Sequence, residues 1–181
     1  SQPPVLGLMV EMYLQNIDPL QTKVRRQFLE HCVQGLEKEY QFWMQGKEQL
    51  VGAATAIKRV VKMPNGVCLN RYWDDSVEPR PESYREDIEA AENIAAAKRP
   101  AFYRNIRAAC ESGWDFSSRW LANQDDLSTI QTTHIVPIDL NCLLYKLETL
   151  LSQFYAELLE SELSSKFAAY AQIRRDAINL Y

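Results

Sequence analysis

The feature of this chain that most limits its fold is the helical spacing of its apolar residues. Between residues 143 and 158, apolar side chains recur every three or four positions, which places them on one wide face of a helix. A second stripe of this kind covers residues 24–43. The first stripe consists of Leu143, Leu144, Leu147, Leu150, Leu151, Phe154, Tyr155 and Leu158, and the second of Val24, Phe28, Cys32, Leu36, Tyr40 and Trp43. Both faces are wider than a coiled-coil seam, so the sequence predicts a packed helical core.

Prolines, glycines and capping residues divide the rest of the chain into further helices. The stretch 5–14 is apolar on most faces and follows a proline pair, so we expect a deeply buried helix there. Further helices are expected over 19–44, about 82–96, 100–113 and the leucine-rich stripe. A last helix begins at Ser164 or Ser165, and its Arg174-Arg175 pair is interpreted as a solvated helix end.

One short region favours extended structure instead. Residues 57–63 and 67–72 lean towards β-structure, and Pro64-Asn65-Gly66 separates them. Asn-Gly supplies the positive φ angles of a tight hairpin turn. The sequence therefore predicts an all-α protein with a small β-hairpin, or a pair of extended arms, near residues 57–72.

Composition narrows the class of protein. The 181 residues are 46% hydrophobic and 24% charged with a net charge of −4, which fits one globular unit or a large piece of one. The small negative charge argues against a nucleic-acid partner, and no apolar run is long enough to indicate a membrane span. The four cysteines form no Cys-x-x-Cys pair and there are two histidines, so no metal site is expected. Four mostly buried free thiols are expected in place of a disulfide framework.

The most informative segment for chemistry is the decapeptide 111–120, Glu-Ser-Gly-Trp-Asp-Phe-Ser-Ser-Arg-Trp. Aromatic faces pack on the C–H faces of a pyranose ring, and a carboxyl group such as that of Asp115 can protonate a glycosidic oxygen. The flanking Trp114 and Phe116 rings are expected to exclude water from Asp115 and favour its protonated form. The alternative is a buried aromatic loop in which Asp115 caps a neighbouring helix.

Five segments together resemble the trehalases, hydrolases of α,α-trehalose that are built on an (α/α)6 barrel. They occur in the family's order and at comparable spacing over nearly the whole chain. The segments are Ser1-Gln-Pro-Pro4, Leu69-Asn-Arg-Tyr-Trp73, Arg80-Pro-Glu-Ser-Tyr84, the decapeptide 111–120 and Ile135-Val-Pro-Ile-Asp-Leu-Asn141. The fold class implied is part of an (α/α)6 toroid of antiparallel helical hairpins.

The resemblance also implies roles for individual residues. Asp115 matches the family's catalytic general acid, which protonates the leaving glucose oxygen. The substrate-binding positions implied are Ser1, Gln2, Arg80, Pro81, Glu82 and Gly113. Asn70, Arg71 and Trp73 are suspected of shaping the pocket. From the residues alone, Arg80 and Glu82 could equally form a surface ion pair. Trehalose is the implied small-molecule partner, and no metal or cofactor is implied.

Departures from the family pattern set limits on the expectation. Inverting glycosidases need a second carboxylate, roughly 6.5–9.5 Å from the acid, to activate water. In the family this base lies on a glycine-rich segment far C-terminal to the acid, and no matching segment occurs before Tyr181. We therefore expect residues 1–181 to be a partial catalytic domain, truncated at both ends, that carries the acid but not the base. The remainder of the domain is then a required partner, and the isolated segment is expected to be inactive and poorly stable.

Other functions fit the same residues. The chain could be a non-catalytic helical carbohydrate-binding or scaffold protein, which keeps sugar-contacting loops without a base. A different inverting glycosidase on the same helical architecture is a further possibility. The resemblance leaves the compartment open, with the periplasm or the outside of the cell slightly favoured over the cytoplasm.

Overall fold

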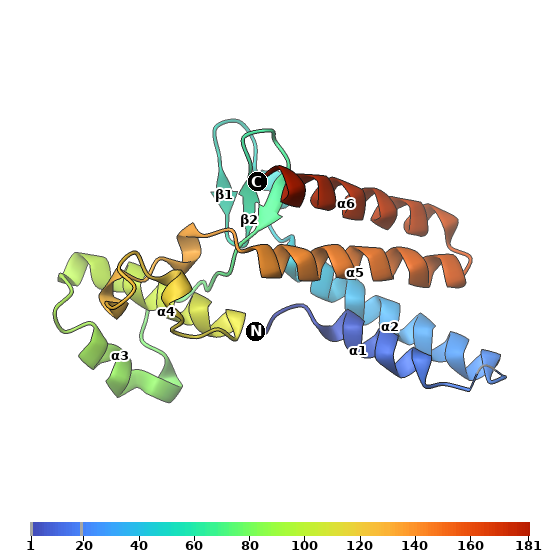
Figure 1. Ribbon diagram of the computed structural model, residues 1–181, viewed down its shortest axis with the longest axis horizontal. Helices are drawn as coiled ribbons and strands as arrows, with labels where there is room; N and C mark the ends of the chain where they lie inside the picture. Colours follow the sequence, from blue (N-terminus) through green and yellow to red (C-terminus); the bar gives the residue numbers. More distant parts are fainter. Residues whose placement is uncertain (1, 19) are drawn as a thin grey trace.

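The computed structural model describes residues 2–18 and 20–181, and its core consists of two antiparallel helical hairpins. Helix α1 (Leu6–Gln15) pairs with α2 (Thr22–Trp43), and α5 (Ile138–Glu157) pairs with α6 (Ser161–Leu180). Figure 1 shows the two hairpins side by side at one end of the molecule, where α5 contacts α1, α2 and α6. The predicted arrangement of helical hairpins is confirmed, except that α2 begins at Thr22 and α6 begins at Ser161.

The leucine-rich stripe forms the centre of this core. Leu140, Leu144, Leu147, Leu150 and Leu151 of α5 are almost completely buried. On α2 the buried face consists of Leu29, Val33, Leu36, Tyr40 and Trp43, whereas Val24 is half exposed. The interpretation of the α5 stripe as core is therefore confirmed. On α2 it is confirmed for Leu36, Tyr40 and Trp43, whereas Phe28 and Cys32 are only partly buried and Leu29 and Val33 take the central positions.

Helix α1 contradicts the expectation of a deeply buried helix. Gly7, Val10 and Leu14 are buried against the core. Met9 and Met12 on the other side keep 62% and 66% of their surface exposed. The helix is apolar on most faces, but in this structure only one of those faces meets α2 and α5. Within the described residues, no helix combines the length and apolar character that a bilayer crossing requires.

The predicted β-hairpin is confirmed and extended by one strand. Strands β1 (Ala56–Ile57), β2 (Val60–Lys62) and β3 (Cys68–Asn70) form an antiparallel sheet in the order β1-β2-β3. Val61 pairs with Leu69, and Gly66 occupies the turn with a φ of 85°. The sheet lies beside the C-terminal end of α6 (Figure 1) and is joined to the helical core through β3.

A buried polar network fixes β3 to the helices. The Arg174 guanidinium, 3% exposed, donates to both carboxylate oxygens of Glu148 on α5 at 2.9–3.0 Å. It also donates to Asn70 Oδ1 and Asn141 Oδ1, each at 3.0 Å. The interpretation of Arg174 as part of a solvated helix end is therefore wrong, because its charge is neutralised inside the core. Arg175 is exposed, as expected.

The opposite end of the molecule holds α3 (Tyr84–Ala90), α4 (Arg99–Ser112) and the loops that follow them. Helix α4 ends as predicted at Gly113, whose φ of 72° is the left-handed conformation that glycine adopts most readily. Helix α3 is shorter than the expected 82–96. Arg99 side-chain nitrogens donate to the carbonyls of Ile94 and Glu92, which satisfies these carbonyls outside a helix.

The cysteines are free, as expected, but less buried than expected. Cys32, Cys68 and Cys110 are half-buried and Cys142 is exposed. Cys142 lies on the outer face of α5, whereas its neighbour Asn141 faces the polar network.

Candidate functional site

One polar pocket brings together three of the predicted sugar-contacting residues. Gln2, Arg80 and Glu82 line the same hollow of about 280 Å³. Its other lining residues are Asp74, Arg107, Cys110 and Glu111. The pocket thus combines the N-terminal segment, the loop 74–82 and the last turns of α4, which are distant from one another in the sequence. Charged and amide groups dominate its wall, which suits a ligand rich in hydroxyl groups.

Arg80 is held in this wall by Asp87. Its backbone N–H donates to Asp87 Oδ2 at 2.8 Å, and its guanidinium donates to Oδ1 at 2.6 Å and to Oδ2 at 3.0 Å. The Asp87 side chain is 4% exposed, so the pair is well shielded from water. These hydrogen bonds raise the pKa of the Arg80 guanidinium, against a smaller lowering by burial. The suggested ion pair between Arg80 and Glu82 does not form, because Asp87 occupies the guanidinium.

The loop that carries Asp115 lies next to Arg80. The Arg80 guanidinium lies 5.2 Å from the centre of the Phe116 ring and donates to Cys110 Sγ at 3.0 Å. Burial raises the pKa of the Cys110 thiol, the Arg80 cation lowers it, and the nearby Asp115 carboxylate raises it. Asp115 therefore lies within electrostatic range of the pocket wall.

The expectation that aromatic rings shield Asp115 from water is wrong for this structure. Asp115 is exposed, and the flanking Trp114 and Phe116 are themselves 56% and 42% exposed. Trp114 packs under the Arg119 guanidinium, whose centre lies 4.9 Å from a ring centre of Trp114, so the ring is drawn towards Arg119. The Asp115 side chain accepts no hydrogen bond within the described residues, so it does not act as the helix cap that was the alternative.

The other predicted positions among the described residues fall outside the pocket wall. Gly113 terminates α4 and redirects the chain, and Pro81 is the exposed first residue of the 3-10 turn η2 (Pro81–Ser83). Ser1 lies outside the described residues. Asn70 belongs to the buried network with Arg174, and Arg71 donates to the carbonyls of Lys58 and Thr133.

Trp73, which was suspected of shaping the pocket, is not one of its lining residues. The guanidinium carbons of Arg71 and Arg104 lie 4.6 and 4.5 Å from the centre of its ring. Its indole N–H donates to Asp75 Oδ1 at 3.0 Å. Through these cationic neighbours and this hydrogen bond, Trp73 stabilises the loop 71–75.

A buried ion pair that includes the lining residue Glu111 supports the pocket. Arg59, which directly precedes β2, donates through Nε and Nη2 to the Glu111 carboxylate. Its Nε lies 3.0 Å from Glu111 Oε1. Glu111 also accepts from the backbone N–H of Trp73 at 2.9 Å. The Arg59 guanidinium stacks on Phe42, 4.1 Å from its ring centre. These contacts join α4, the sheet and the loop 71–75, and so determine where Asp74 lies in the pocket.

Sequence reasoning missed four of the lining residues, namely Asp74, Arg107, Cys110 and Glu111. Asp74 and Glu111 lie within segments that carry the family resemblance, but neither was assigned to the site. Arg107 had a detectable signal, because residues 107, 110 and 111 share one helical face that leads directly to Gly113. That face is the only part of α4 seen in the pocket wall.

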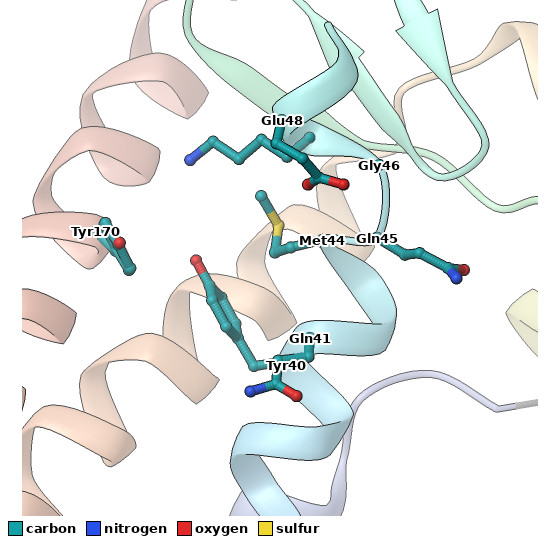
Figure 2. A pocket seen from close by; sticks show the side chains of 8 residues that line it. Tyr40, Gln41, Met44, Gln45, Gly46, Glu48 and Tyr170 are labelled. Carbon is teal, nitrogen blue, oxygen red and sulfur yellow. The ribbon is translucent and has the colours of Figure 1, made fainter.

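A larger hollow elsewhere contains none of the predicted residues. It has a volume of about 350 Å³ and lies between the end of α2 and α6. Figure 2 shows Tyr40, Met44 and Tyr170 facing one another across it. The Lys47 ammonium lies 5.4 Å from the centre of the Tyr170 ring. This larger hollow lacks the clustered guanidinium and carboxylate groups of the polar pocket.

No group of three or more His, Cys, Asp or Glu side chains suited to a metal ion occurs within residues 2–18 and 20–181. The polar pocket itself offers guanidinium, carboxylate and amide groups. This is the chemistry that the resemblance implied for a glycoside hydrolase. A comparison with protein families agrees, because the family described as Trehalase matches residues 1–181, the entire chain. The protein thus belongs to the trehalase family of glycoside hydrolases, which cleave trehalose.

Proposed function

We propose that the polar pocket is one side of a trehalose-cleaving site that works with inversion, and that Asp115 is its general acid. In this reaction water attacks the anomeric carbon of one glucose while its bond to the bridging oxygen breaks. The Asp115 proton passes to that oxygen, which leaves on the second glucose, and a base takes up a proton from the water. The observation that carries the proposal is the convergence of Gln2, Arg80 and Glu82 on one pocket beside Asp115.

The exposed position of Asp115 is compatible with this role if substrate completes the site. A bound disaccharide lying against Phe116 and Trp114 would displace water from the Asp115 carboxyl group. Loss of water favours the neutral, proton-carrying form of a carboxyl group. The half-exposed rings provide apolar surface on which sugar C–H faces can pack.

We place the general base outside residues 1–181. Asp74 is paired with Arg107 and Glu111 with Arg59, so neither carboxylate is available to activate water. Glu82 matches a sugar-binding position. The proposal accordingly includes a partial catalytic domain whose helical hairpins form part of an (α/α)6 toroid, with the base supplied by the rest of that domain.

Replacement of Asp115 by Asn tests the assignment in a catalytically complete protein that contains residues 1–181. Loss of the proton donor should lower kcat by about 10²- to 10⁴-fold. Trehalose binding, measured by calorimetry, should persist. Asp125→Asn is the matched control, because Asp125 is also an exposed loop carboxylate and should leave glucose release unchanged. Turnover by Asp115→Asn within a few-fold of the unmodified protein would refute the role of Asp115.

Two further observations separate inversion and catalysis from the alternatives. Proton NMR of the first products should show one α- and one β-glucose per trehalose, whereas a retaining enzyme would release two α-glucoses. Binding of trehalose without any glucose release by the complete protein would support the non-catalytic carbohydrate-binding function instead.

A further inference from the structure

Arg107 lines the polar pocket from α4 and is not among the positions to which the family resemblance gives a role. We propose that Arg107 is a substrate-positioning residue that donates hydrogen bonds to hydroxyl or ring oxygens of the bound sugar. This inference rests on the proposed function of the pocket. It is carried by the contacts that the two guanidiniums of the pocket make in this structure.

The nitrogens of Arg80 are largely occupied. Nε and Nη2 donate to Asp87, and Nη1 donates to Cys110 Sγ. Those contacts hold the Arg80 guanidinium in the wall and leave it few N–H groups for a ligand. Arg80 therefore shapes the pocket and supplies charge more than it supplies free donors.

Arg107 is arranged differently. Its Nε lies 3.0 Å from Asp74 Oδ1, which is an ion pair, but the angle is not that of a hydrogen bond. Nε is buried and makes no hydrogen bond within the described part of the chain, and neither Nη atom of Arg107 donates a hydrogen bond there. The Arg107 side chain is 21% exposed. A half-buried guanidinium with unused donors at a pocket wall can donate hydrogen bonds to the oxygen atoms of a bound ligand.

Asp74 fixes the orientation of this guanidinium. Asp74 Oδ1 accepts from the backbone N–H of Ser76 at 2.7 Å, which holds the carboxylate in the loop. The loop itself is held by Arg104, whose Nε donates to the Asp74 carbonyl at 3.1 Å. With one edge of the Arg107 guanidinium fixed by Asp74, the other nitrogens are available to the pocket. A planar fork of this kind can contact two neighbouring sugar oxygens at once.

The experiment compares three variants in a catalytically complete protein that contains this chain, with trehalose as the probe. Arg107→Gln removes the charged donors. Arg107→Lys keeps the charge opposite Asp74 but loses the planar pair of donors. Arg99→Gln is the matched control, because Arg99 lies on the same helix, donates to the carbonyls of Ile94 and Glu92 and does not line the pocket. KM, kcat and melting temperature are measured for each.

We expect Arg107→Gln to raise KM by about 10- to 100-fold with a smaller change in kcat, because a charge-assisted contact made in the bound state is lost. Arg107→Lys should keep most of this rise and should melt like the unmodified protein. Arg99→Gln should leave KM unchanged. Recovery of KM in Arg107→Lys, or an equal rise in Arg99→Gln, would show that Arg107 supports only the fold and would overturn the inference.

The failure of this inference differs from the failure of the proposed function. If Asp115→Asn abolishes turnover while Arg107→Gln leaves KM unchanged, the pocket is catalytic and Arg107 has no part in binding. If Asp115→Asn remains active, the proposed function itself fails. Calorimetric titration of trehalose into the Arg107→Gln, Asp115→Asn double variant gives a readout independent of turnover, and affinity equal to that of Asp115→Asn alone would also overturn the inference.

Discussion

The buried Arg174–Glu148 pair offers the sharpest test of how this fold is held together. Replacing Arg174 by Met removes the guanidinium but keeps an apolar side chain of comparable length. Glu148, which is 1% exposed, then loses its ion-pair partner. Asn70 Oδ1 also loses the hydrogen bond from Arg174, whereas Asn141 Oδ1 still accepts from the Asn70 backbone N–H at 2.9 Å.

The expected cost follows from these contacts. An uncompensated buried charge costs about 3–5 kcal/mol, and one orphaned buried acceptor adds about 1 kcal/mol. Arg174→Met should therefore lower the free energy of unfolding by about 4–6 kcal/mol. The double variant Arg174→Met, Glu148→Gln removes both charges. It should lose less free energy of unfolding than Arg174→Met alone, because no unpaired charge remains.

Equilibrium unfolding in urea, followed by circular dichroism, measures these differences. Arg175→Met is the matched control, since Arg175 is the exposed neighbour, and its cost should stay within about 0.5 kcal/mol. A loss below about 1 kcal/mol for Arg174→Met, or a double variant that loses the sum of the two single costs, would refute the reasoning.

Two other predictions concern the pocket and the pH response. Asp87→Asn should raise KM for trehalose about tenfold, because Arg80 loses the carboxylate that orients it, and steady-state kinetics with an unchanged KM would contradict this. Burial raises the pKa of Glu39 from 4.5 to about 7, although the Leu6 backbone N–H lowers it. The folded state therefore binds more protons than the unfolded state between these values, so the free energy of unfolding should fall as pH rises from 4.5 to about 7. Glu39→Gln should flatten that slope in urea unfolding at several pH values, and an unchanged slope would exclude Glu39 as its source.

Local sequence patterns predicted most of the secondary structure because their causes are local. The stripe on α5 specifies a helix and its buried face together, and Asn65-Gly66 specifies a hairpin turn. Gly113 marks the end of α4 because a left-handed residue is favoured there. The errors arose where local preference competes with contacts from elsewhere. Helix α3, for example, ends early, with Arg99 bonded to carbonyls that a longer helix would have used internally.

The candidate site was only partly predictable for a similar reason. The family resemblance supplied Gln2, Arg80 and Glu82, and the structure brings these residues to one pocket. The aromatic flanks of Asp115 suggested a dry environment, but adjacency in sequence does not determine on which side of a residue its neighbours lie. Trp114 packs with Arg119, and Asp115 is left in water.

The sequence alone determined the helices, the hairpin turn and the family, because periodicity, turn chemistry and motif order are properties of neighbouring residues. Only the tertiary structure decided which charges meet. Arg174 looked like a surface residue until α6 packed against α5 and placed Glu148 opposite it, and Arg107 looked unremarkable until the loop at Asp74 folded over α4. A buried charge is stable only beside its partner, and that partner lies on another element whose position depends on the packing of the whole core.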